Sequence, residues 1–199
     1  SLIHTEKLDG ENNCLSRHGV FARSHTAPTT SPWTEHLRRY WQFIKNDLGD
    51  LEIFLENVYA IHSIAYSKLD HHFFVFAVRE NGQWLSWEET CFYAAMLDLP
   101  VVPVIKKLST PASRQKFESE LLDIVKGPGA FAANDAFTGA PATMEGVVTR
   151  DAGSYPVSSF AEHVFKYVRK GHVKTDVHWT RNWRRARLNF EGGKHVDYQ

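Results

Sequence analysis

A single lysine stands inside a short polar segment near the start of the chain, Thr5-Glu6-Lys7-Leu8-Asp9-Gly10-Glu11-Asn12. Residues 2–5 are strand-like and Asp9-Gly10 is a turn signal, so Lys7 is predicted at the junction of a strand and a tight turn. A lysine amine attacks as a nucleophile only when it is neutral, which requires desolvation or neighbouring cations. The segment suits covalent chemistry at Lys7, although taken alone such a motif more often marks an exposed lysine in a hairpin.

Five further segments carry charged and aromatic residues in a definite order. They are Phe21-Ala22-Arg23-Ser24-His25, Phe54-Leu55-Glu56-Asn57, Phe73-Phe74-Val75-Phe76, Glu145-Gly146-Val147-Val148 and Lys166-Tyr167-Val168-Arg169. Together with the Lys7 segment they resemble, in order and approximate spacing, the nucleotidyltransferase motifs of the ATP-dependent RNA ligases, within the superfamily of polynucleotide ligases and mRNA capping enzymes. The connecting residues 59–66, 85–90, 101–104 and 167–179 favour the RNA ligase branch of that superfamily.

The resemblance implies a fold and a reaction. The fold would be α+β, an ATP-grasp-like ligase adenylation (nucleotidyltransferase) fold with antiparallel sheets flanked by helices and a central nucleotide cleft. Lys7 would attack the α-phosphate of ATP, release pyrophosphate and become lysyl-AMP. The AMP would pass to the 5′-phosphate of an RNA end, and a 3′-hydroxyl would then displace it to seal the strand. Each step is a substitution at phosphorus, so positioning and charge neutralisation should dominate.

The resemblance also implies roles for individual residues. Lys166 would neutralise the α-phosphate and, as a nearby cation, favour the neutral amine of Lys7. Glu145 would bind Mg²⁺ or Mn²⁺, directly or through water, with Glu56 and Asp9 as further candidate metal ligands.

Other residues are expected to contact the nucleotide or the RNA. Glu6 would contact the adenine amino group, Glu56 a ribose hydroxyl, and Phe76 would stack on the adenine, with Phe74 as the alternative on the same strand face. The expected nucleotide-binding set is Glu6, Lys7, Asp9, Asn12, Arg23, Glu56, Phe76 and Lys166, and the expected RNA-binding set is Arg23, Arg169, Lys170 and His172. Asp9 and Gly10 are expected to shape the turn.

The chain departs from the family pattern at one motif position. Val168 stands where the family usually has a second lysine, so Arg169 or Lys170 takes that phosphate contact or it is absent. The family also has a region before the Lys7 motif, and often a C-terminal RNA-binding domain, which are not evident here. We expect one adenylyltransferase domain over residues 1–199, with a trimmed N-terminus and no separate C-terminal domain, stronger in self-adenylylation than in sealing.

The elements that must position these residues follow from periodicity and turn signals. The predicted strands are Leu2–Thr5, Asn13–Arg23 with a turn at His18-Gly19, Leu51–Glu56, Tyr59–Tyr66, Phe73–Val78, Leu99–Ile105 and Met144–Arg150. The predicted helices begin after Ser31 and end at Gly49, run from Ser86 to about Leu97, and run from about Pro111 to Val125. Residues 158–169 fit either element, and 179–188 form a basic helix candidate containing Trp179 and Trp183.

Composition sets the broad class of the protein. The 199 residues are 43% hydrophobic, and 23 Lys and Arg balance 23 Asp and Glu, which indicates a globular chain whose basic sites are local. Cys14 and Cys91 are too few for a disulfide scaffold, and no apolar run approaches the length of a membrane span, so we expect a cytoplasmic monomer without a membrane partner. The 11 histidines lack a compact metal spacing, and His172 and His178 are expected to serve the RNA or nucleotide end of the site.

Two other functions fit the same residues. The chain could be an RNA-end binding module whose ligase-like pocket does not seal, or a DNA ligase or capping-type nucleotidyltransferase. The tail arginines 181, 184, 185 and 187 with Trp179 and Trp183 suit phosphates and stacked bases, and they also fit a solvated helix.

Overall fold

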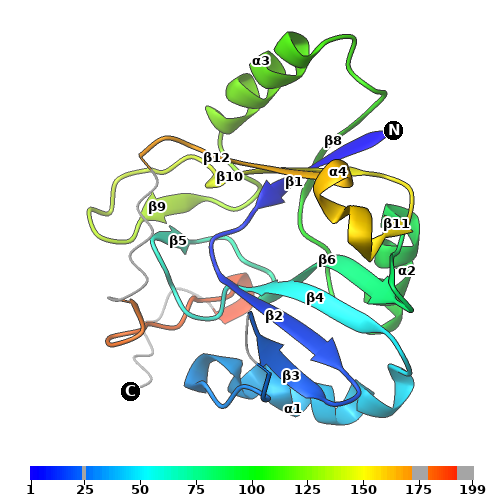
Figure 1. Ribbon diagram of the computed structural model, residues 1–199. Coiled ribbons are helices and arrows are strands. Elements are labelled where there is room, and N and C mark those ends of the chain that lie inside the picture. The colour runs from blue at the N-terminus through cyan, green and yellow to red at the C-terminus, as the bar shows by residue number, and fades with distance from the viewer. Residues whose placement is uncertain (24–25, 172–178, 192–199) are drawn as a thin grey trace.

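The computed structural model consists of two antiparallel sheets that lie one above the other in Figure 1, with helices on their outer sides. It describes residues 1–23, 26–171 and 179–191. The α+β class with antiparallel sheets and helices, which the sequence predicts, is confirmed.

The upper sheet has four strands in the order β12-β10-β1-β8. They are β1 (Leu2–Lys7), β8 (Val104–Leu108), β10 (Gly146–Asp151) and β12 (Val164–Val168). Helix α3 (Arg114–Val125) covers the outer face, where Leu121 and Val125 pack with Val147 of β10. Burial of each such side chain contributes about 1.5–3 kcal/mol, which keeps this face of the sheet against the helix.

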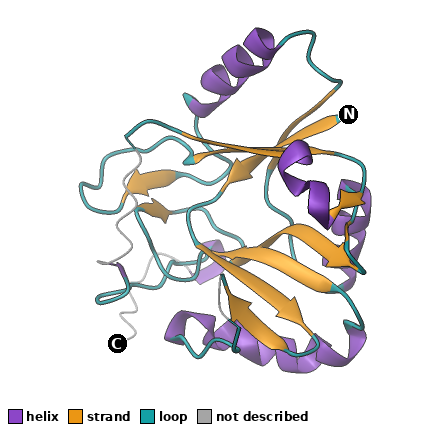
Figure 2. Cartoon of the chain, viewed as in Figure 1, coloured by secondary structure: helices purple, strands orange, loops and turns teal. Residues whose placement is uncertain are grey.

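The lower sheet has six strands in the order β11-β7-β6-β4-β2-β3. They are β2 (Glu11–Ser16), β3 (Gly19–Ala22), β4 (Glu52–Asn57), β6 (Phe73–Glu80), β7 (Gln83–Trp84) and β11 (Tyr155–Pro156). Helices α1 (Glu35–Ile44) and α2 (Trp87–Met96) cover its outer side, as Figure 2 shows, and bury Leu37 and Ala94 in one core with Leu15, Ile53 and Val75. A separate pair, β5 (Ile64–Tyr66) and β9 (Ala133–Asp135), lies beside the two sheets.

Several predicted boundaries are confirmed by local geometry. Ser86 and Glu89 form a reciprocal capping box at the start of α2, as the Ser and the acidic first turn predict. The helix expected after Ser31 begins as a 3₁₀ turn, Pro32–Thr34, continues as α1 and ends in a second turn, Lys45–Asp47, before Gly49 at φ 54°. Asn81 and Gly82 both have positive φ and turn β6 into β7.

Two predicted strands differ from the structure. Of the strand predicted over Tyr59–Tyr66, only Ile64–Tyr66 forms one, and of Leu99–Ile105 only the end joins β8. Residues 99–103 instead cross from one sheet to the other. Val102 N–H donates to Val75 O of the lower sheet, and Glu6 N–H of the upper sheet donates to Pro103 O. Leu99 and Val102 are thus buried without a ladder of their own.

The C-terminal part of the chain also differs from expectation. Residues 158–169 divide into a 3₁₀ turn (Val157–Ser159), α4 (Phe160–His163) and β12, so both interpretations of that stretch are correct in part. Residues 180–188 are not a helix; they run as turns and extended chain, and Asn189–Glu191 form a 3₁₀ turn. Within the three described ranges, no helix is long and apolar enough to cross a membrane.

Candidate active site

A cavity of about 650 Å³ lies between the inner faces of the two sheets. Strand alternation explains its walls, because every second side chain of β1, β10 and β12 faces the lower sheet. Its lining contains nine of the residues predicted to bind or react: Glu6, Lys7, Asp9, Asn12, Arg23, Glu56, Phe76, Glu145 and Lys166. The sequence motifs, which lie far apart in the chain, therefore meet in one site.

Lys7 ends β1 and faces Glu145, which immediately precedes β10. Antiparallel pairing of Lys7 with Gly146 brings the end of one strand beside the start of the other, and Lys7 Nζ lies 2.8 Å from Glu145 Oε2. The lysine side chain is 16% exposed and the glutamate fully buried. The amine is thus held rigidly by a buried carboxylate while one side stays open to the cavity.

The turn after Lys7 is held from several directions. Asp9 Oδ2 accepts hydrogen bonds from the backbone N–H and hydroxyl of Ser63 and from Ile64 N–H, at 2.8–2.9 Å. Gly10 N–H donates to Glu56 Oε1 at 3.0 Å, and a Cβ on Gly10 would lie 2.3 Å from Asn57 O. The turn therefore needs glycine for close approach of two backbones, and Asp9 shapes the turn as the sequence predicts.

Glu56 on β4 forms part of the opposite wall of the cavity. Burial raises its pKa to about 8, and the negative charges of Glu145 and Asp9 add to the rise while Lys7 opposes it. At neutral pH the carboxyl group is therefore largely protonated in the free protein, and it can both donate and accept hydrogen bonds.

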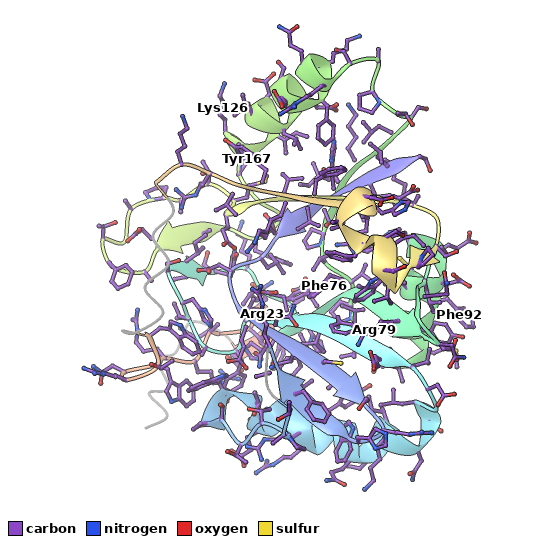
Figure 3. All side chains as sticks on the ribbon, in the orientation of Figure 1. Arg23, Phe76, Arg79, Phe92, Lys126 and Tyr167 are labelled. Carbon is purple, nitrogen blue, oxygen red and sulfur yellow. The ribbon has the colours of Figure 1, made fainter. Side chains whose placement is uncertain are left out.

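Phe76 reaches the cavity through an irregularity in β6. Leu55 pairs with Val75 but Phe54 pairs with Ala77, so Phe76 is an extra residue in the strand. The bulge places Phe76 and Ala77 together in the cavity lining, and Figure 3 shows Phe76 between the sheets. Phe74, the alternative stacking residue, is 4% exposed and belongs to the core. Of the two candidates on β6, Phe76 is thus the one whose ring is available to a bound base.

Glu6 takes part in the cavity lining, but its carboxylate turns toward the loop after α3. Its Oε1 accepts a hydrogen bond from Ala130 N–H at 3.1 Å, and Gly129 leaves the space it occupies, since a Cβ there would lie 1.7 Å from that oxygen. Burial raises the pKa of Glu6 to about 7. A contact with an adenine amino group stays a prediction for this residue.

The last motif lies on β12. Tyr167 packs against the α3 side, as Figure 3 shows, so its neighbours Lys166 and Val168 face the lower sheet. Lys166 pairs with Val148, which pairs with Thr5, and Val168 pairs with Gly146, which pairs with Lys7. Lys166 is thus two residues away from the Lys7 row, on the same face of the sheet, and the valine occupies that row.

The remaining RNA-binding candidates lie outside the cavity lining. Arg169 directly follows β12 and lies within electrostatic reach of Asp135, and Lys170 is exposed. Their roles stay predictions, and His172 and His178 fall outside the described residues.

The structure adds residues that sequence reasoning missed. Arg150 of β10 is 7% exposed, donates to Phe76 O and lies 5.2 Å over the Trp87 ring; burial lowers its pKa to about 10. Arg150 lies two residues after Val148 on the same strand, so strand alternation could have placed it on the cavity face. Other missed lining residues are Trp84, Tyr155, Phe160 and His62, whereas Trp179, which the sequence suggests for base stacking, does line the cavity.

Two smaller expectations concern metals and cysteines. Among the residues that the structure describes, no three His, Cys, Asp or Glu side chains gather as a metal cage. Cys14 and Cys91 are both free and half-buried, and burial raises the pKa of Cys14 to about 12, in keeping with packing thiols.

Comparison with known proteins agrees with this arrangement. The family model described as RNA ligase matches residues 1–168. The chain belongs to the RNA ligase family. Its fold is similar to two forms of an archaeal ATP-dependent RNA ligase, at TM-scores of 0.52 and 0.51 with 20% and 21% identity. It is also similar to a protein from Aquifex aeolicus assigned as an ATP-dependent DNA ligase, at a TM-score of 0.51 and 21% identity.

The structural alignments behind these comparisons cover most of this chain of the RNA ligase family but less than half of each of the other proteins. Each covers 84% of this chain but only 42% or 43% of the other one, so the chain spans less than half the length of those proteins. A search of curated proteins found no significant match.

Proposed function

We propose that residues 1–199 act as the adenylyl-transferring domain of an ATP-dependent RNA ligase, in which Lys7 carries the AMP. One observation supports this most directly. Lys7 Nζ lies 2.8 Å from buried Glu145, inside a cavity whose facing wall presents Phe76 and Glu56. A positioned amine, a carboxylate and an aromatic ring around one cavity match the needs of nucleotide transfer to a lysine.

The first step would join Lys7 to the α-phosphorus of ATP. The N–P bond forms as the P–O bond to pyrophosphate breaks, and pyrophosphate leaves with the electron pair. Glu145 Oε2, which accepts a hydrogen bond from Nζ, is the group positioned to take the proton that the amine loses. The same contact orients Nζ before ATP arrives.

The other lining residues would position the nucleotide. Phe76 stacks on the adenine, and protonated Glu56 hydrogen-bonds to a ribose hydroxyl. Lys166 reaches from β12 to neutralise charge on the phosphates, and Arg23 at the cavity edge meets the sugar or the RNA end.

A divalent cation fits this donor set. Mg²⁺ binds one or two carboxylates and keeps water and phosphate ligands, so it needs no cage of three protein groups. Glu145 would hold it, with the Asp9 carboxylate near enough to contribute charge, and Glu56 would join the ligands only on losing its proton. When bound, Mg²⁺ or Mn²⁺ would neutralise phosphate charge.

The later steps would use an RNA end. AMP passes from Lys7 to the 5′-phosphate, and the 3′-hydroxyl of a second end then attacks that phosphate and releases AMP. The two free cysteines suit a reducing, cytoplasmic setting for this reaction.

The decisive experiment measures AMP transfer to Lys7. The wild-type chain is incubated with α-labelled ATP and Mg²⁺ or Mn²⁺, and label retained on the denatured protein is counted. We expect label that survives alkali and is released by acid, as a P–N bond should be. Lys7→Ala should carry none, while Lys107→Ala, an exposed lysine on neighbouring β8, should label normally. Equal labelling of Lys7→Ala would refute the assignment.

A second candidate is an RNA-end binding module that does not seal. Val168 favours it, because an apolar side chain stands in the register row of Lys7 where the family usually has a cation. Wild-type protein that binds 5′-phosphorylated RNA but never gains AMP would establish this alternative. Parallel assays with RNA and DNA ends, and with ATP and GTP, separate an RNA ligase from a DNA ligase or capping-type enzyme.

A further inference from the structure

The final described residues, 179–191, form a strap that lies across residues 59–72; we call it the C-terminal strap. Ile61 N–H donates to Arg184 O at 2.8 Å, and Ala186 N–H donates to Tyr59 O at 2.7 Å. Ala186 is 2% exposed, so the strap is docked rather than loosely attached. It lies beyond residues 1–168, the part that matches the RNA ligase family.

The strap carries aromatic rings to the edge of the cavity. Trp179 stacks on His62 with ring centroids 3.8 Å apart and planes at 20°, and both residues belong to the cavity lining. Trp33 contacts Trp179 edge to face at 4.8 Å and Trp183 at 6.1 Å. The rings form one continuous group that begins at the cavity and extends along the strap.

The strap is also strongly basic. Residues 179–191 contain four arginines and one acid, Glu191. Glu191 accepts two hydrogen bonds from Arg185. These bonds lower the pKa of Glu191 to about 2, although burial acts in the opposite direction. Arg181 and Arg184 are exposed, and neither has a carboxylate ion pair within the described residues. In the chain they alternate with the ring-bearing residues Trp179 and Trp183.

We propose that the C-terminal strap binds single-stranded RNA next to the end that is joined. Arg181 and Arg184 contact backbone phosphates, and a base stacks on Trp179 at the cavity edge. Alternating cations and aromatic faces are the groups that hold unpaired nucleotides, since each base offers a stacking face and each phosphate a charge. The site rests on the proposed ligase function, and it supplies a local basic surface to a chain with no net charge.

The test compares RNA affinity in matched charge-reversal variants. The RNA is a 5′-phosphorylated strand of about 12 nucleotides with a 3′ fluorophore, and binding is followed by anisotropy at several KCl concentrations. R181E/R184E should bind about tenfold more weakly, and the slope of log affinity against log salt should fall by about 1.4, or 0.7 for each lost phosphate contact. R39E/R114E, which reverses two exposed arginines on α1 and α3, changes net charge equally and should bind as the wild type does.

A second variant tests the stacking part of the site. Trp179→Ala should weaken RNA binding at least about fivefold at all salt concentrations, because a lost stack removes no phosphate contact. Thermal melting verifies that each variant is folded, and R181Q/R184Q replaces the double variant if it is not.

The outcomes separate the strap from the ligase assignment. If R181E/R184E has the affinity and the salt slope of the wild type, the strap is not an RNA site. Equal losses of RNA affinity in R181E/R184E and R39E/R114E would also overturn the proposal. Labelling of Lys7 with AMP is measured on the same preparations. Absence of label on the wild type refutes the ligase function, whereas the RNA affinities still decide the strap.

Discussion

Lys7 and Val168 occupy one row of the upper sheet, separated only by Gly146. Two strand spacings put their Cα atoms about 10 Å apart. Gly146 has no side chain between them, and a Cβ there would lie 1.9 Å from Tyr167 O, so close packing of β10 against β12 requires glycine. A long side chain at position 168 would therefore extend over Gly146 toward the Lys7 amine.

Val168→Lys should place a cation in this row. We expect AMP transfer to 5′-phosphorylated RNA to rise about tenfold, because a hydrogen bond to a charged group contributes roughly 1.5–3 kcal/mol. Single-turnover rates from preformed lysyl-AMP measure the change. Phe165→Lys, on the opposite face of the same strand and already 51% exposed, is the control. A similar rise in both variants would show that only net charge matters.

Phe74 and Phe76, two of the three phenylalanines of β6, should separate an effect on stability from an effect on ATP binding. Phe76→Ala should weaken ATP binding by about fivefold or more through a lost stack, with little change in melting temperature. Phe74→Ala removes a core ring that is 4% exposed, and it should cost about 3–5 kcal/mol of unfolding free energy. Titration with ATP measures the affinity of each variant, and denaturant unfolding measures its stability. The reverse pattern would mean that Phe74 is the stacking residue.

Phe76 also illustrates what the sequence could not predict. Strand alternation puts Phe74 and Phe76 on one face, and it cannot separate their roles. The extra residue between Val75 and Ala77 does so, and a bulge depends on how β4 pairs with β6. By contrast, the approach of Lys7 to Glu145 was within reach of the sequence, because both motifs lie at strand ends that antiparallel pairing joins.

The helix predicted over residues 179–188, in the C-terminal strap, does not form, for a related reason. Composition and spacing in residues 179–188 suit a helix, but Ala186 and Arg184 hydrogen-bond to residues 59–61 instead. Residues 59–61 have an irregular backbone whose N–H and C=O groups need hydrogen-bond partners. The sequence of residues 180–188 does not show that it will supply them.

Glu6 should make stability fall as pH rises. Burial raises the pKa of Glu6 to about 7 in the folded protein, against an ordinary value of 4.5, so the unfolded chain loses this proton first. The contribution is present below about pH 4.5 and is lost as pH rises toward 7, by an amount of the order of 3 kcal/mol. Glu6→Gln should remove this part of the slope in denaturant unfolding between pH 5 and pH 8, while Glu118→Gln, on the exposed side of α3, should not. An unchanged slope in Glu6→Gln would contradict the shift.

Gly10→Ala should disturb the turn beside the nucleophile. The added Cβ would lie 2.3 Å from Asn57 O, a backbone atom, so the turn must move. We expect a loss of about 1–3 kcal/mol in unfolding free energy and slower labelling of Lys7. Gly153→Ala meets only an ordinary contact at 3.7 Å and serves as the control. Wild-type labelling by Gly10→Ala would show that the turn tolerates the shift.

The short turn from Leu8 to Gly10 joins β1 of one sheet to β2 of the other. Lys7 is carried by the upper sheet, whereas Phe76 and Glu56 are carried by the lower one. The turn is not free to act as a hinge, because Asp9 accepts hydrogen bonds from Ser63 and Ile64 and Gly10 N–H donates to Glu56. The spacing between the attacking amine and the base-binding wall is thus set in part by the turn itself, and a displaced turn would misalign the amine even with both sheets intact.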